Sequence, residues 1–249
     1  MMKTILKKAY LCMTVNAILS TAFCLNSCDD GDVHPLSGES LGNRNFTVRT
    51  HFRELDAWPA EYTLALAAYD GPDNPVPLVK TTLSKPADSE TEKIIYLANV
   101  PTAAQRLSIS LMKGSVKQYD YFTTDISKGE TDLTLTVAPI HLAALSHIQQ
   151  LVFDNSCSRC HGANGVPTAG LNLTNGNSYA SLVGQQAVCD PNGAMRVYPG
   201  DAGKSFLHSM LTDNTVEANQ NGLNHTDMLD AADLVALVTS WINHGAENN

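Results

Sequence analysis

Cys157-Ser158-Arg159-Cys160-His161 places two thiols three positions apart and an imidazole directly after the second thiol. Each thiol can add to one vinyl group of a haem, so the pair can form two thioether bonds to the same ring. The imidazole of His161 then lies where it can bind the iron as its proximal ligand. The spacing therefore predicts a covalent haem c on Cys157, Cys160 and His161, with iron as the metal.

Two other interpretations of the cysteine pair remain open. A redox dithiol of the thioredoxin type would need a strand–helix–strand pattern around the pair, and the flanking sequence lacks one. A structural zinc site would need a second pair of ligands, but Cys189 is the one other cysteine after the motif. Haem attachment uses all three residues of the motif, so we favour it.

The N-terminus indicates export, which agrees with attachment of haem c outside the cytoplasm. Lys3, Lys7 and Lys8 precede an apolar stretch over residues 9–23 that is too short and interrupted for a transmembrane helix. Leu25-Asn26-Ser27-Cys28 follows and resembles the lipobox of bacterial lipoproteins. The resemblance implies cleavage before Cys28 and lipid on this cysteine. An ordinary signal peptide with an incidental cysteine is the alternative.

Acidic residues follow the cysteine at once. Asp29-Asp30-Gly31-Asp32 resembles the surface-export signal of Bacteroidetes lipoproteins, with a solvated linker as the alternative. Loss of residues 1–27 removes three lysines and no acid, which changes the formal charge from −9 to −12. Such a charge excludes nucleic acid as a partner and leaves membrane attachment to the acyl chains. We expect an outer membrane lipoprotein that faces the periplasm or the cell surface.

The hydrophobic pattern changes near residue 138. Before this point apolar residues alternate with period two, and after it they recur with helical spacing. The sequence therefore predicts a multidomain chain, with an immunoglobulin-like all-β sandwich followed by an all-α haem domain. The expected divisions are a signal peptide at 1–27, an acidic flexible linker at 28–42, the β-sandwich at 43–138 and the haem domain at 139–249.

Seven alternating segments, separated by turns that contain Pro and Gly, support the β-sandwich. They cover residues 45–52, 62–69, 78–83, 93–97, 106–112, 117–123 and 131–137. This region carries no catalytic constellation. We expect it to act as a spacer or as a binding module for a glycan or a protein.

Helical spacing begins near residue 141. One expected helix ends at the haem motif, and shorter helices begin near Ser178 and near Asp201. The clearest helix is the last one, which Asp230 can cap, with Asp233 three residues later as a capping-box partner and Gly245 at the C-terminal end. Its buried stripe comprises Leu234, Leu237, Val238, Trp241 and Ile242.

Residues 141–249 resemble a cytochrome c-like domain of bacterial exported proteins, here in a Bacteroidetes-type lipoprotein with an N-terminal β-sandwich. The most specific matching piece is the haem motif, with Leu151-Val152-Phe153 before it and Gly162 after it. Weaker pieces follow in the expected order, among them Arg196-Val197-Tyr198-Pro199-Gly200-Asp201 and Trp241-Ile242-Asn243-His244-Gly245-Ala246. The resemblance implies an all-α cytochrome c-like fold, covalent haem and electron transfer.

The sixth iron ligand is less certain in the sequence than the proximal one. Related domains commonly carry Met-Pro ahead of the last helix, and that Met binds the iron, but this chain has no Met-Pro there. His225 lies near the expected place, so we predict His225 as the ligand, with Met228 as the alternative and an absent ligand also open. His208 and Met210 are fallbacks that we expect to serve packing. A thioether ligand would give a higher reduction potential than a second imidazole.

The sequence therefore predicts a membrane-anchored monohaem c-type cytochrome that transfers single electrons between redox partner proteins, and an electron carrier rather than an enzyme. Two alternatives stay open. One is a surface lipoprotein whose β-sandwich binds a glycan or a protein partner, with an auxiliary haem domain. The other is a haem peroxidase or gas sensor with an open sixth position.

Overall fold

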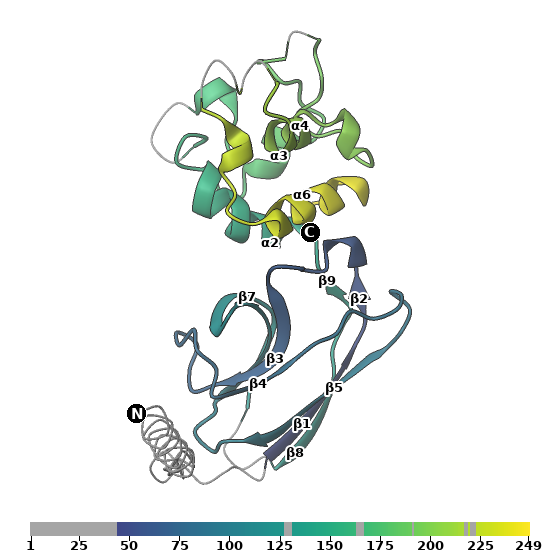
Figure 1. The fold of residues 1–249 in the computed structure, drawn as a ribbon, viewed down its shortest axis with the longest axis vertical. Helices are drawn as coiled ribbons and strands as arrows, with labels where there is room; N and C mark the ends of the chain where they lie inside the picture. Colours follow the sequence, from purple (N-terminus) through teal and green to yellow (C-terminus); the bar gives the residue numbers. More distant parts are fainter. Residues whose placement is uncertain (1–43, 127–130, 163–166, 191, 217–218, 220–222) are drawn as a thin grey trace, which may run out of the picture. The chain divides into compact units, whose positions relative to one another are not determined.

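The computed structural model describes residues 44–126, 131–162, 167–190, 192–216, 219 and 223–249 (Figure 1). These residues belong to one compact unit. The predicted signal peptide, Cys28 and the acidic linker lie outside the described residues. No helix among the described residues has the length and the apolar composition of a membrane span.

Strands occupy the first half of the described chain, and each of the seven predicted alternating segments contains one. One sheet has the order β5-β1-β8, and a second has the order β4-β3-β6-β7, in which all neighbours are antiparallel. A short parallel pair, β2-β9, completes the β region. The bounds are β1 Arg44–Thr50, β2 Phe52–Arg53, β3 Thr63–Tyr69, β4 Val79–Thr82, β5 Lys93–Val100, β6 Arg106–Lys113, β7 Val116–Asp125, β8 Asp132–Thr136 and β9 Ile140–His141.

Alternation places the apolar side chains of the two sheets in a shared core. Phe46 and Val48 of β1 belong to the same buried cluster as Leu64 and Leu66 of β3. Successive side chains of a strand point to opposite faces, so one apolar face of each strand can enter this core. The period-two pattern of the sequence therefore reflects the burial of one face of each strand.

The central strands β3 and β6 are buried on their other face as well. There the Tyr69 hydroxyl donates to Ser110 Oγ at 2.9 Å, and Lys117 Nζ lies 4.5 Å from the centre of the Tyr69 ring. Lys117 comes from β7, which bends strongly in Figure 1 and has two register shifts against β6. Bulges of this kind increase the bend of a strand, so β7 can cover polar side chains that a flat sheet would expose.

Short helices and irregular segments make up the described chain after residue 141. The longest element, α6 (Ala232–Asn243), has 12 residues, and η2 (Gln149–Cys157), a π-helix that continues α2 (Leu145–Ile148), has nine. Three single β-bridges link residues 183–205. The remaining elements are η3 Thr168–Gly170, α3 Ser178–Leu182, η4 Ala202–Lys204, α4 Phe206–Thr212 and η5 His225–Asp227, while η1 (Leu55–Ala57) lies in the β region.

The predicted fold class, an immunoglobulin-like all-β sandwich followed by an all-α cytochrome c-like domain, is wrong. The chain is rich in strand, and residues after 141 form no all-α domain within the described chain. Glycines explain part of the difference, because Gly184, Gly193 and Gly200 have positive φ angles of 69°, 72° and 86° and interrupt the helical spacing. In the β region, β1 pairs parallel with β8, an arrangement that alternation of apolar residues does not indicate.

The last helix also begins differently from the prediction. Ala231 is its N-cap and has no side-chain capping bond, so neither Asp230 nor Asp233 caps the helix. Asp230 instead pairs with Lys113 Nζ at 3.0 Å. The predicted C-terminal end is confirmed, because Gly245 follows the C-cap with a φ of 102° and donates to the Ile242 carbonyl.

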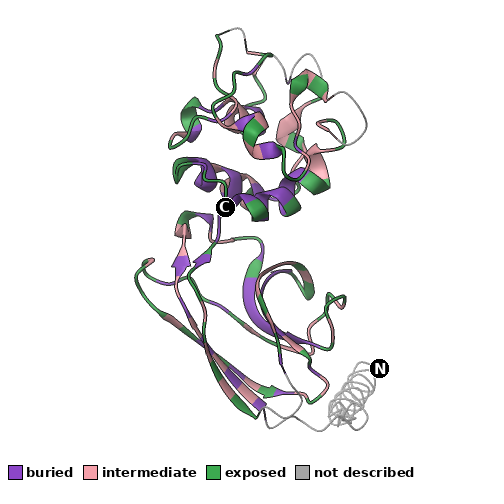
Figure 2. Cartoon of the chain, turned by 180° about the vertical axis from the view of Figure 1, so that it is seen from behind, coloured by how far each residue is buried: buried purple, intermediate pink, exposed green. Residues whose placement is uncertain are grey.

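Asp233 links α6 to the loop before β3. Its carboxylate accepts hydrogen bonds from the backbone N–H groups of Ala60, Glu61 and Tyr62, each at 2.8 Å. Residues on one side of α6 are buried, as Figure 2 shows. A carboxylate that receives three backbone donors is a strong tether, because hydrogen bonds to a charged group exceed neutral ones in strength.

Replacing Asp233 with Asn should lower the free energy of unfolding by about 1.5–3 kcal/mol, because an amide nitrogen would face backbone donors. Chemical denaturation measures this loss. Asp125→Asn is the matched control, since Asp125 is 86% exposed in a surface ion pair with Arg106 and should cost less than about 1 kcal/mol. Equal losses in the two variants would contradict the tether.

Candidate functional site

The haem motif begins at the last residue of η2 and continues into a turn. Cys157 closes the π-helix, and its carbonyl oxygen accepts the N–H groups of Cys160 at 3.3 Å and His161 at 3.1 Å. Cys157 is half-buried and Cys160 is exposed, and both are free thiols. The turn therefore gathers both sulfurs and the imidazole of His161 at the end of one helical segment.

These side chains line a cavity of about 350 Å³. His225 and Met228, the two predicted candidates for the sixth ligand, line the same cavity. The volume lies within the ordinary range for cofactor pockets. Most of the remaining wall is apolar and includes Leu171, Leu173, Leu182, Phe206, Leu207, Met210 and Leu211.

His161 and His225 approach one another across this cavity. Their ring centres are 6.3 Å apart, and the ring planes are inclined by 34°. His161 Nδ1 lies 3.1 Å from the carbonyl oxygen of Thr168, and His225 Nδ1 lies 3.0 Å from Asn219 Oδ1. Both partners are acceptors, so each Nδ1 carries the proton and each Nε2 keeps its lone pair. Metal-binding histidines are held in this tautomer by such outer partners.

The spacing of the two rings fits a single metal between them. An imidazole nitrogen binds a metal at about 2.0–2.1 Å, which places the metal roughly 3 Å from the ring centre. Two rings on opposite sides of one metal therefore need centres about 6 Å apart, close to the 6.3 Å between His161 and His225. Together with the two cysteines and the apolar wall, this donor set fits an iron porphyrin.

Ionisation of the side chains agrees with this fit. Burial, followed by electrostatic repulsion between the two imidazoles, lowers the pKa of His225, which favours the neutral form that binds metal. Burial, followed by the neighbouring Cys160, raises the pKa of Cys157 to about 11. A redox dithiol needs a thiol with a lowered pKa, so the environment of Cys157 argues against that alternative.

Arg196 holds the loop that contains Thr168, the residue whose carbonyl oxygen accepts a hydrogen bond from His161. Arg196 Nη2 donates to the Ala169 carbonyl at 2.9 Å, and Nη1 donates to the Ser181 carbonyl at 2.8 Å. Ala169 has a φ of 57°, which is unfavourable for a residue with a side chain. Because Thr168 precedes Ala169 and accepts from His161, the guanidinium holds in place the loop that orients the His161 imidazole.

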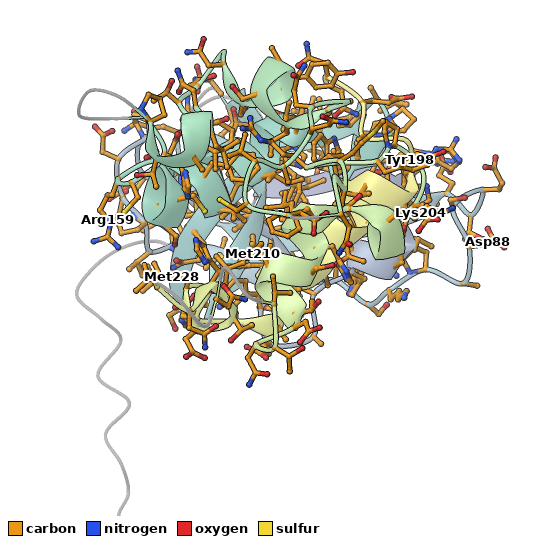
Figure 3. All side chains as sticks on the ribbon, turned by 90° about the horizontal axis from the view of Figure 1, so that it is seen from above. Asp88, Arg159, Tyr198, Lys204, Met210 and Met228 are labelled. Atoms are coloured by element: carbon orange, nitrogen blue, oxygen red, sulfur yellow. The ribbon has the colours of Figure 1, made fainter. Side chains whose placement is uncertain are left out.

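Met228 shares a turn with His225. The turn η5 is a 3₁₀ helix, and the Met228 N–H donates to the His225 carbonyl at 3.1 Å. Residues three apart in such a turn eclipse one another, so both side chains can face the cavity. Met210 also lines it, whereas His208 does not. In Figure 3, Arg159 of the motif and Met228 are labelled at the left of the view, and Met210 is labelled near its centre.

Two supporting residues carry no role in the sequence-based prediction. Arg196 belongs to a segment that the resemblance includes, but its spacing indicates no contact with the motif. Asn219 lies six residues before His225, in no recognisable motif. Only the folded chain shows that each supports one imidazole.

No family model, curated protein or solved structure matches this chain. Among the described residues, no cluster of three or more His, Cys, Asp or Glu side chains is arranged to hold a metal ion. The geometry of the described residues defines the site: the two motif cysteines, Cys189 and the imidazoles of His161 and His225 line one largely apolar cavity.

Replacing Gly162 with Ala should disrupt the turn after His161. Gly162 has a φ of 139°, and an added Cβ would lie 2.5 Å from Asn172 Oδ1. Backbone strain and overpacking together should lower the free energy of unfolding of the haem-free chain by about 2–6 kcal/mol.

Gly176→Ala is the matched control, because Gly176 also has a positive φ of 81° but no atom within 4 Å of an added Cβ. This substitution should lower the free energy of unfolding by about 1 kcal/mol. Urea denaturation of both variants measures the difference, and equal losses would show that the Asn172 contact is unimportant.

Proposed function

We propose that this protein is a lipid-anchored monohaem c-type cytochrome that passes single electrons between redox partner proteins. The observation that carries the proposal is the meeting of Cys157, Cys160, His161 and His225 at one apolar cavity. The motif alone supplies three of these groups. The fourth comes from a segment more than 60 residues later in the sequence and lies with its ring centre 6.3 Å from that of His161.

Each group of residues at the site would have a separate role. When bound, haem iron supplies a one-electron couple between the ferric and ferrous states. The sulfurs of Cys157 and Cys160 would hold the ring covalently in either state. His161 and His225 would hold the iron with the same kind of ligand. The apolar wall would limit the access of water to the ring.

Two axial imidazoles favour electron transfer over the other haem functions. A peroxidase or gas sensor needs an exchangeable position on the iron, and the 6.3 Å between the ring centres of His161 and His225 supports the binding of both imidazoles to one metal. The binding of a glycan by the β region stays a prediction. A bis-histidine site also implies a lower reduction potential than a His/Met site.

The anchor completes the proposal. Cys28, as a lipidated first residue of the mature chain, would attach the protein to the outer membrane, facing the periplasm or the cell surface. Several acyl chains on one cysteine satisfy the requirement for stable attachment. The redox partners would then be proteins that reach the same side of that membrane.

Covalent attachment should depend on both motif cysteines. The full chain, produced in a host that matures haem c, should carry one haem in its intact mass, and a Cys157→Ser, Cys160→Ser double variant should carry none. Cys189→Ser is the control and should keep the haem, since Cys189 lines the same cavity but lies outside the motif. A wild-type mass that accounts only for polypeptide and acyl groups would end the proposal.

His225→Ala should convert the ferric protein from low-spin to high-spin, because one strong axial ligand is lost. Optical spectroscopy reports the change. His208→Ala is the control and should remain low-spin, because His208 does not line the cavity. If only Met228→Leu changes the spin state, Met228 is the ligand and the assignment of His225 is wrong.

A further inference from the structure

We propose that Asn219 is a positioning residue for His225 and sets the tautomer and electron-donating strength of that axial imidazole. This inference rests on the proposed function, because it concerns the ligand opposite His161. Asn219 is 5% exposed and lies between α4 and η5. Among the described residues, its side chain makes no hydrogen bond to the motif cysteines or to His161.

The hydrogen bonds of Asn219 fix the orientation of its carboxamide. Its Nδ2 donates to the carbonyl oxygens of Met210 and Asp213, both at 3.0 Å. Its Oδ1 accepts from the His225 backbone N–H at 3.0 Å. A flipped carboxamide would point its NH₂ group at that N–H and its oxygen at two carbonyls, so only one orientation satisfies every group.

That orientation determines the tautomer of His225. Asn219 Oδ1 lies 3.0 Å from His225 Nδ1 and can only accept, so Nδ1 must carry the proton. The lone pair is then on Nε2, the nitrogen available to a metal. One oxygen holds both the backbone and the ring of His225, which limits rotation of the ring about its side-chain bonds.

The same hydrogen bond controls how strongly the imidazole donates electrons. An acceptor at Nδ1–H increases the basicity of the ring, and a carboxylate does so more than a neutral amide. On the other side of the cavity, the acceptor for His161 is the backbone carbonyl of Thr168, which a side-chain substitution does not remove. Asn219 is therefore the side-chain group through which this chain can adjust an axial ligand.

Two substitutions should shift the reduction potential in opposite directions. In the haem-loaded full chain, Asn219→Leu removes the acceptor, so the potential should rise, and cyanide should bind the ferric protein about 10- to 100-fold faster. Asn219→Asp keeps an acceptor and makes it anionic, so the potential should fall. Both variants lose the donors to Met210 and Asp213, so a merely structural role predicts shifts of the same sign.

Gln149→Leu is the matched control. Gln149 is an equally buried amide that bonds to Asp154, Leu173 and Ser178 and touches neither imidazole. It should lower stability and leave the potential unchanged. Redox titration and the intact mass of each protein are the measurements.

The outcomes separate the two proposals. Absence of covalent haem from the wild-type protein overturns the proposed function. Haem-loaded Asn219 variants that shift in the same direction, or no further than Gln149→Leu, overturn the role of Asn219 alone. If Asn219→Leu does not fold, the sign of the Asn219→Asp shift decides.

Discussion

The site depends on two imidazoles whose ring centres lie 6.3 Å apart at one apolar cavity. Neither ring is held by the cavity wall alone. Thr168 fixes Nδ1 of His161, and Asn219 fixes Nδ1 of His225, so each ring has one defined tautomer. An apolar cavity lined by freely rotating imidazoles would have no preference for a metal at its centre. The two outer hydrogen bonds would supply that preference.

The β region contributes to this arrangement through contacts with the helices. His147 of α2 packs against Tyr119 and Tyr121 of β7, with ring centres 4.9 and 4.7 Å apart. The same helical segment continues through η2 to Cys157. Asp233 ties α6 to the loop before β3. The strands therefore support the helical segment that carries the motif through His147, and they support α6 through Asp233.

The sequence predicts some parts of this structure well and others not at all. Local patterns succeed: alternation locates the seven strand segments, and the helical stripe locates α6 and its end at Gly245. The motif residues are contiguous, so their proximity follows from the chain itself. The predicted fold class is wrong for two reasons. The helical spacing after residue 141 does not indicate where glycines with positive φ interrupt the helices, and alternation does not reveal that β1 pairs parallel with β8. Asn219 could not be predicted, since its role arises from a tertiary contact between two turns.

The low-temperature electron paramagnetic resonance spectrum of the ferric protein tests the central claim most directly. If His161 and His225 both bind the iron and keep the 34° between their ring planes, the rings would be closer to parallel than to perpendicular, and they would separate the energies of the iron dxz and dyz orbitals. We predict a rhombic low-spin signal from the native ferric protein. We also expect the haem to stay attached to the chain after denaturation. A high-spin signal, or the absence of any haem signal from protein matured in a competent host, would contradict it.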